Sequence, residues 1–195
     1  MPGKKRVFAF DFDGTLTTAD TLICFIRYAC GTRALVAGLL LYSPLLVLMR
    51  LRLYPNYKAK QRVFAHFFGG MDAAGFDALC RGFAASSRHL LRPRGVRAVE
   101  AARESGAEVL IVSASIDNWV APFFRGVTVL GTRVETAGGR LTGRFLGSNC
   151  YGREKVRRIQ ELFPDRGSYH LTAFGDSRGD REMLAWADEG HYRAF

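Results

Sequence analysis

Two aspartates, Asp11 and Asp13, stand one residue apart directly after the apolar run 6–10. The run alternates too little for a half-exposed strand, which predicts a central strand of a parallel sheet, buried on both faces. Because ligands bind beyond the carboxyl ends of the strands in an open α/β sheet, both carboxylates are expected in a candidate active site. Carboxylates this close repel each other, which favours a divalent cation between the chain and an anionic substrate. These residues alone also allow a plainer interpretation, in which they cap a turn or helix.

A serine, Ser113, occupies the corresponding position after the second predicted strand, 108–112. A helix beginning near Ile116 would direct free backbone N–H groups at an anion there, with the Ser113 hydroxyl as a further donor. Ser115 or Asp117 could act only as the cap of that helix, and this interpretation is compatible with the first.

The last predicted strand, 169–174, also ends in carboxylates, Asp176 and Asp180, four positions apart in a glycine-containing loop. A predicted helix over 154–163 carries Lys155 at its start. Most lysines on such a helix are solvated, so the residue type alone does not make Lys155 catalytic. A doubly wound sheet would bring the three strand ends and this helix start together.

The elements between these residues predict the rest of an α/β fold. Residues 93–105 are expected to form a helix with proline in its first turn. Residues 127–130 predict a strand, and residues 133–142 predict a hairpin that turns at Gly138 and Gly139. With 195 residues, the chain suits one α/β domain with a modest insertion.

Between residue 16 and residue 91, helical patterns replace strand patterns. Asp20 is predicted to cap a first helix. The stretch 34–49 follows, carries no charge, and contains Ser43 and Pro44 near its middle. A transmembrane helix needs about 20 apolar residues, so a clean span is disfavoured. We expect two apolar half-helices that meet near Pro44.

The stretch 34–49 has two interpretations from sequence. A helix that is apolar on every face is usually buried, which would place the stretch inside a helical bundle. Alternatively, a hairpin enters the membrane interface through residues 34–53 and is held against acidic head groups by basic residues around it. The basic residues are Lys4, Lys5, Arg6, Arg50, Arg52, Lys58, Lys60 and Arg62.

Lysine and arginine exceed aspartate and glutamate by 28 to 18, and this net charge of +10 favours anionic partners. Phosphate esters, acidic lipid and nucleic acid all fit, but a nucleic-acid role is disfavoured because the sequence lacks zinc-finger spacing, an RNP-type motif and a basic zipper. The four cysteines lack ligand spacing and are expected to be reduced, buried thiols of a cytosolic protein. The apolar run after the basic amino terminus is too short for a signal peptide, so secretion is not expected.

Together, the motifs strongly resemble those of the haloacid dehalogenase (HAD) superfamily of phosphotransferases. The first motif corresponds to residues 11–15, the second to Ser113, the third to Lys155 and the fourth to residues 175–180. The resemblance implies an α/β fold with a HAD-like Rossmannoid parallel sheet and an inserted helical cap.

The resemblance also implies how the chain is divided. Residues 1–15 and 92–195 would form the Rossmannoid catalytic core, and residues 16–91 would form the cap inserted after the first strand. This cap resembles that of the phosphoserine-phosphatase-like branch, subfamily IB.

The resemblance assigns the catalytic roles. Asp11 would attack phosphorus and form an aspartyl phosphate, which divides hydrolysis into two steps. Asp13 would protonate the leaving alcohol and then take a proton from the attacking water. Ser113, Lys155 and backbone N–H groups near Phe12, Asp13 and Ala114 would hold the phosphoryl oxygens.

The same resemblance implies Mg²⁺ as the cofactor. Asp11, the main-chain carbonyl of Asp13 and Asp176 would hold the ion, and Asp180 would orient the waters bound to it. Because Asp13 is suited to protonating a leaving alcohol, the sequence favours a phosphatase over a dehalogenase.

The choice of substrate depends on the cap. Asp20 falls where phosphoserine phosphatases have an acidic residue that contacts substrate, although capping a helix explains it equally well. The stretch 34–49 resembles the cap of the phosphatidylglycerophosphatase C group, membrane-associated members of the same branch. Residues 150–156 and 190–195 are also similar to that group.

The leading hypothesis is a Mg²⁺-dependent phosphomonoesterase that acts on an anionic lipid phosphate such as phosphatidylglycerophosphate. It would lie in the cytoplasm, at the cytoplasmic face of the inner membrane. The alternatives are a soluble phosphatase for phosphoserine-like or sugar phosphates and, less favoured, a nucleic-acid-binding protein.

Overall fold

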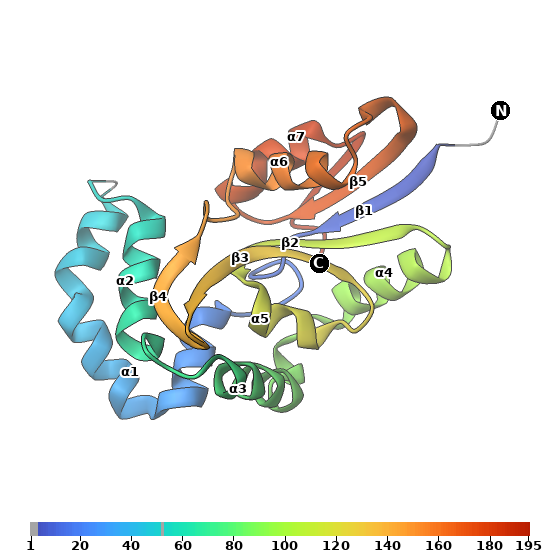
Figure 1. The fold of residues 1–195 in the computed structure, drawn as a ribbon. Helices are drawn as coiled ribbons and strands as arrows, with labels where there is room; N and C mark the ends of the chain where they lie inside the picture. Colours follow the sequence, from blue (N-terminus) through green and yellow to red (C-terminus); the bar gives the residue numbers. More distant parts are fainter. Residues whose placement is uncertain (1–3, 52) are drawn as a thin grey trace.

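The computed structural model describes residues 4–51 and 53–195 and is built around one twisted sheet (Figure 1). The strand order is β4-β3-β2-β1-β5-β6, and every neighbouring pair is parallel except β3 and β4. The α/β class and the parallel sheet predicted from the sequence are therefore confirmed. The strands are β1 (Lys5–Phe10), β2 (Glu108–Ile116), β3 (Thr128–Ala137), β4 (Arg140–Leu146), β5 (Tyr169–Gly175) and β6 (Glu189–Tyr192).

Helices cover both faces of this sheet, with α6 and α7 on one face and α4 and α5 on the other (Figure 1). Strand β1 is central, and its side chains alternate between the two hydrophobic clusters: Val7 and Ala9 lie in one, and Phe10 lies in the other. This burial explains its continuous apolar sequence. The helices are α1 (Thr21–Arg50), α2 (Asn56–Phe68), α3 (Ala73–Ser86), α4 (Pro93–Glu104), α5 (Asp117–Val120), α6 (Arg153–Leu162) and α7 (Arg181–Trp186).

Helices α1, α2 and α3 lie between β1 and β2 in the chain and beside the β3–β4 hairpin in space (Figure 1). The two chain crossings into this helical segment meet, because Thr17 bridges Leu91 and the Arg92 N–H donates to the Leu16 carbonyl at 2.8 Å. Aromatic packing joins the segment to the sheet: the Phe25 ring of α1 stacks on Trp119 of α5, with 4.9 Å between centroids. The division into a core and a cap stays a prediction.

The expected break of α1 at Pro44 is wrong, because the helix is interrupted at Gly31 instead. Gly31 has φ +83° and ψ 163°, which are not helical values, and helix resumes after it and continues through Pro44 to Arg50. A proline inside a helix frees the carbonyl four residues earlier. Here that carbonyl belongs to Leu40, and the Ser43 hydroxyl donates to it at 2.8 Å, so the helix tolerates Pro44.

The interpretation of residues 34–49 as bundle interior is wrong for most of the stretch. Leu35 and Gly38 are buried, but large apolar side chains on the outer side of α1 are exposed. By length and composition α1 could cross a bilayer, and 11% of its most apolar window is buried. The large apolar residues of 34–53 that are exposed are Val36, Leu40, Leu41, Val47, Leu48, Leu51 and Leu53.

Two smaller expectations also change. Strand β2 does not end at residue 112: it continues to Ile116 across a register shift, so Ser113 lies within the strand. The cysteines are free, as expected, but Cys24 and Cys30 are partly exposed rather than buried.

Candidate active site

A buried ammonium group lies between two carboxylates at the carboxyl ends of β1 and β5. Lys155 Nζ donates to Asp11 Oδ1 and to Asp180 Oδ1, both at 2.5 Å, and to the Val112 carbonyl at 2.7 Å. The lysine side chain is 2% exposed. It comes from the first turn of α6, and the fold brings it to Asp11 and Asp180, which lie 144 and 25 positions away in the sequence. A fully buried lysine with two carboxylate partners is not an ordinary solvated surface lysine.

Asp180 has both carboxylate oxygens occupied. Its Oδ1 accepts from Lys155, and its Oδ2 accepts from the Ser177 N–H, the Ser177 hydroxyl and the Asp176 N–H. Burial opposes ionisation, but Lys155 and the Ser177 donors outweigh it and lower the pKa of Asp180. This carboxylate therefore fixes the 176–180 loop and Lys155, and its predicted role in orienting metal-bound waters stays a prediction.

Asp11 and Asp176 present the oxygen atoms best placed for a metal ion. The Thr15 hydroxyl contacts both, at 3.3 Å from Asp11 Oδ2 and 3.1 Å from Asp176 Oδ1. Carboxylate oxygens of Asp11, Asp176 and Asp180 all lie within 4.8 Å of one another. Gly14, at φ +82°, allows this approach, because a Cβ there would lie 2.8 Å from Asp176 Cγ. Three carboxylates against one ammonium leave a local excess of negative charge, and hard oxygen donors suit Mg²⁺.

Burial raises the pKa of Asp11 to about 7, although the neighbouring Lys155 charge acts in the opposite direction. Burial disfavours the ammonium form of Lys155 as well, but Asp11 and Asp180 outweigh this effect and raise the pKa of Lys155 above its usual value. Lys155 is thus charged across the physiological range, and Asp11 is poised between its two protonation states. A cation bound beside Asp11 would favour the ionised form.

Asp13 contacts the start of α1 and not the lysine–carboxylate cluster. Its Oδ1 accepts from the Thr21 hydroxyl at 2.6 Å and from the Thr21 N–H at 3.0 Å, and its Oδ2 accepts from the Ser115 hydroxyl. Burial and the charge of Asp20 raise the pKa of Asp13, while the two hydroxyl donors oppose them. A raised pKa suits a carboxyl group that must deliver a proton.

The sequence interpretation missed the two side chains that hold Asp13. The sequence predicts Ser115 only as a helix cap, but no side chain caps α5. Thr21 was not singled out, yet it also accepts from Trp119 Nε1 at 3.2 Å. The only sequence signal was a hydroxyl residue just past Asp20, which is too common to be informative.

The remaining predicted phosphate-binding groups lie around the same crevice. Ser113 is 1% exposed. Its hydroxyl accepts from the Ser115 N–H at 3.0 Å, within the register shift of β2. Across residues 4–51 and 53–195, the N–H groups of Phe12 and Asp13 have no protein acceptor, so they are free to bind an anion. The Ala114 carbonyl is fixed by the Thr132 hydroxyl at 3.0 Å.

Asp20 is exposed and acts as the N-cap of α1, where its Oδ1 accepts from the Leu22 N–H at 2.9 Å. The capping interpretation is therefore confirmed. Its charge acts on Asp13, so Asp20 lies close enough to influence the site, and a substrate contact stays a prediction.

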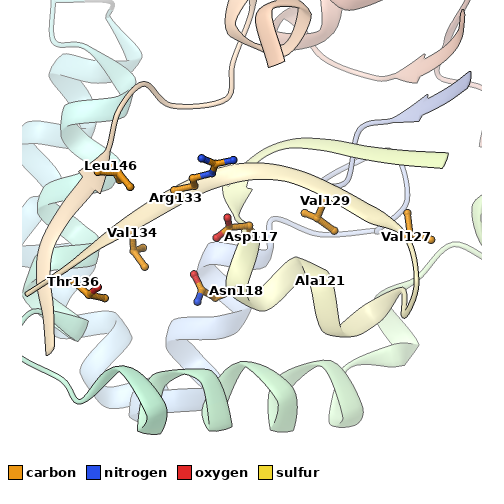
Figure 2. A pocket seen from close by; sticks show the side chains of 9 residues that line it. All are labelled: Asp117, Asn118, Ala121, Val127, Val129, Arg133, Val134, Thr136 and Leu146. Carbon is orange, nitrogen blue, oxygen red and sulfur yellow. The ribbon is translucent and has the colours of Figure 1, made fainter. Parts of the chain in front are cut away.

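A separate open cavity of about 490 Å³ lies between α5 and the β3 strand (Figure 2). Asp117 and Arg133 line it together with apolar side chains that include Val129 and Val134. None of the predicted site residues lines this cavity. The predicted site residues therefore lie outside this cavity.

The haloacid dehalogenase-like hydrolase family matches residues 8–185, and the chain belongs to this family. Within it, the chain is an enzyme of the phosphatase type, with phosphatases among its relatives. Membership explains why the carboxylates, the serine and the lysine meet at one edge of the sheet.

Protein CicA of Caulobacter vibrioides is 40% identical over 204 residues, which cover 100% of this chain and 89% of CicA. A phosphoserine phosphatase of a Polaromonas species is 28% identical over 191 residues, covering 93% of this chain and 76% of the relative. A solved structure of a protein of unknown function from Bordetella pertussis has a TM-score of 0.78 at 22% identity and covers 94% of this chain and 87% of its own. This structural likeness concerns the fold alone.

Proposed function

We propose that the chain is a Mg²⁺-dependent phosphomonoesterase that works through an aspartyl phosphate on Asp11. The observation that carries this proposal is the buried pairing of Lys155 with Asp11 and Asp180, beside Asp176. Mg²⁺ bound by Asp11, Asp176 and the Asp13 carbonyl would neutralise charge on the phosphate as the carboxylate approaches.

In the first step, an Asp11 carboxylate oxygen forms a bond to phosphorus as the bond from phosphorus to the leaving oxygen breaks. Asp13 gives its proton to that leaving oxygen. In the second step, Asp13 takes a proton from water, the water oxygen bonds to phosphorus, and the bond to Asp11 breaks. Ser113, Lys155 and the free N–H groups of Phe12 and Asp13 hold the phosphoryl oxygens throughout.

We infer further that the substrate is an anionic lipid phosphate presented at a membrane surface. The support is the outer side of α1 and the segment after it, where Leu40 and Leu41 of the helix and Leu53 beyond it are 69%, 63% and 72% exposed. A large exposed apolar patch is uncommon on soluble monomers and is typical of interaction sites, and several large exposed apolar side chains occur in this one segment. A chain docked through residues 34–53 would receive its substrate at the cytoplasmic face of the inner membrane.

Positive charge near this apolar surface supports the same proposal. Arg50, Lys58 and Arg62 are exposed at the end of α1 and along α2. Acidic head groups attract such residues by about 1 kcal/mol each. Apolar insertion and charge together give stable but reversible binding.

A soluble substrate is the second candidate. The slot beside Ser115, lined by Leu22, Lys60 and Trp119, has a volume of only about 10 Å³. This is about the space of one water molecule, so the slot by itself selects no leaving group. The phosphoserine phosphatase relative adds weight to this candidate.

A phosphate-release panel tests these proposals together. Phosphatidylglycerophosphate in mixed micelles, phosphoserine and sugar phosphates are each assayed with Mg²⁺ or with EDTA. We expect Mg²⁺-dependent release, fastest from the lipid. Release from phosphoserine alone would select the soluble alternative, and undiminished release in EDTA would contradict the metal.

Binding to vesicles tests the membrane surface separately. The wild type is expected to pellet with acidic liposomes, and Leu40→Asp with Leu53→Asp should abolish pelleting. Leu146→Asp is the matched control, because Leu146 is 54% exposed but lies on β4. Equal pelleting of both variants, or no pelleting of the wild type, would contradict the membrane proposal.

A further inference from the structure

The backbone at Arg193, directly after β6, adopts an unusual conformation. Arg193 is the only residue other than glycine with positive φ in the described parts of the chain, at +54°. This left-handed conformation is unfavourable for a residue with a Cβ and persists only where surrounding contacts impose it. Such positions often serve a function, so the contacts of Arg193 are informative.

Three contacts hold Arg193 in place. Its N–H donates to the Gly175 carbonyl at 2.8 Å, and its Nε donates to the Asp176 carbonyl at 3.4 Å. Its guanidinium also lies over the Tyr192 ring, 5.0 Å from the centroid. Arg193 is therefore attached to the last residue of β5 and to the residue that follows it.

Two residues further on, Phe195 anchors the same segment to the sheet. Its ring stacks on Phe174 with 5.1 Å between centroids and on Phe10 with 6.3 Å. Phe10 directly precedes Asp11, and Phe174 lies two residues before Asp176. The 192–195 segment thus spans the ends of the two strands that carry the carboxylates.

The 192–195 segment also borders the carboxylate cluster directly. A cavity of about 150 Å³ is lined by Gly14, Thr15 and Asp176 together with Arg92 and Arg193. Arg92 Nε donates to the Thr17 carbonyl at 3.1 Å, so Arg92 holds the segment after Asp13, as Arg193 holds Asp176.

We propose that Arg193 is a positioning residue that fixes Asp176 for metal binding. Asp176 is held at three points: its N–H by Asp180 at 3.2 Å, its carboxylate by Thr15 at 3.1 Å and its carbonyl by Arg193. Without the Arg193 guanidinium, the Asp176 carbonyl loses this donor, and Asp176 is held at two points instead of three. This inference rests on the proposed metal site and assigns Arg193 a role that the catalytic motifs do not contain.

Two substitutions separate the side chain from the backbone conformation. Arg193→Ala removes the guanidinium and keeps the unfavourable φ, whereas Arg193→Gly removes the guanidinium and accepts that φ readily. Arg94→Ala is the matched control, because Arg94 is an exposed arginine on α4. If Arg193→Ala does not fold, Arg193→Gly decides the question.

The test measures metal affinity directly, as Mn²⁺ binding by electron paramagnetic resonance and as the Mg²⁺-induced rise in Tm. Residues that orient a metal ligand change affinity by about 10-fold or more, so both Arg193 variants should bind about 10-fold more weakly than the wild type. Their Tm without metal should match that of Arg94→Ala. Activity at saturating Mg²⁺ should recover, so the change falls on the Mg²⁺ concentration needed and not on kcat.

The outcomes distinguish this inference from the proposed function. If the wild type binds metal and both Arg193 variants bind it equally well, the positioning role is wrong and the metal site stands. If the wild type itself binds no Mg²⁺ or Mn²⁺, the metal site fails and this inference fails with it. A loss of kcat that excess Mg²⁺ does not restore would also overturn the positioning role.

Discussion

Replacing Lys155 with methionine keeps most of the side-chain volume and removes the charge from the centre of the site. The ammonium contacts Asp11 and Asp180 at 2.5 Å each, and all three side chains are at most 8% exposed. Breaking a buried ion pair by removing one partner costs about 3–5 kcal/mol, because the remaining charge is uncompensated. We therefore expect the metal-free Lys155→Met variant to lose about 3 kcal/mol of unfolding free energy at pH 8.

The loss should depend on pH in a defined direction. Lys155 lowers the pKa values of both Asp11 and Asp180, so both rise when it is removed. At pH 5 the carboxylates can take up protons and the repulsion between them falls. The destabilisation by Lys155→Met should therefore be smaller at pH 5 than at pH 8.

Urea unfolding of the metal-free proteins at pH 5 and pH 8 measures both effects. Lys58→Met is the matched control, because Lys58 is an exposed lysine on α2. The double variant Lys155→Met with Asp180→Asn should regain part of the stability but none of the activity, which should fall at least ~10²-fold with the loss of a phosphoryl-binding cation. A Lys155→Met variant as stable as the control at pH 8 would refute the reasoning.

Three further predictions concern Asp11, Asp13 and Asp176. The pKa of Asp11 is raised to about 7, so below that pH Mg²⁺ must displace a proton in order to bind. The affinity for Mg²⁺ should therefore fall by about 10-fold per pH unit below pH 7 and level off above pH 8. Isothermal titration calorimetry measures this dependence. Thr21→Val removes a donor that lowers the pKa of Asp13, so the alkaline limb of the rate profile should move to higher pH, and an unmoved limb would contradict the role of Asp13 as acid. Gly14→Ala places a Cβ against Asp176 at a φ of +82°. The variant should lose about 1 kcal/mol or more of unfolding free energy, measured with urea, and should no longer bind Mg²⁺. Retained Mg²⁺ binding would show that the close approach of Gly14 to Asp176 is not needed.

The positions of the main acids could be predicted because strand ends in a parallel sheet converge. Asp11 and Asp176 follow apolar runs that have few alternatives to buried parallel strands, and these strands are neighbours in the sheet. The role of Lys155 was harder to predict, because lysines on a helix of this kind are usually exposed to solvent. Only the resemblance to a family motif identified it. Thr21 and Ser115 could not be predicted, because their contact with Asp13 depends on how the start of α1 meets the end of β2.

The fold could be predicted for an element that is buried on both faces, such as β1. It was harder to predict for an element with one buried and one exposed side, such as α1. The continuous apolar sequence of β1 specifies a central strand. Residues 34–49 are just as apolar, yet among them only Leu35 and Gly38 are buried. A proline was expected to break the helix, and a local hydroxyl donor at Ser43 preserves it while Gly31 provides the kink.

The central claim, that Asp11 carries the phosphoryl group, is tested most directly by borohydride trapping. Borohydride reduces an acyl phosphate to the alcohol, so an aspartyl phosphate at residue 11 becomes homoserine and is located by peptide mass spectrometry. We predict homoserine at position 11 only when substrate and Mg²⁺ are both present, and none in Asp11→Asn, which should also lack phosphatase activity. Reduction at another carboxylate, or phosphate release by Asp11→Asn at the wild-type rate, would contradict the account.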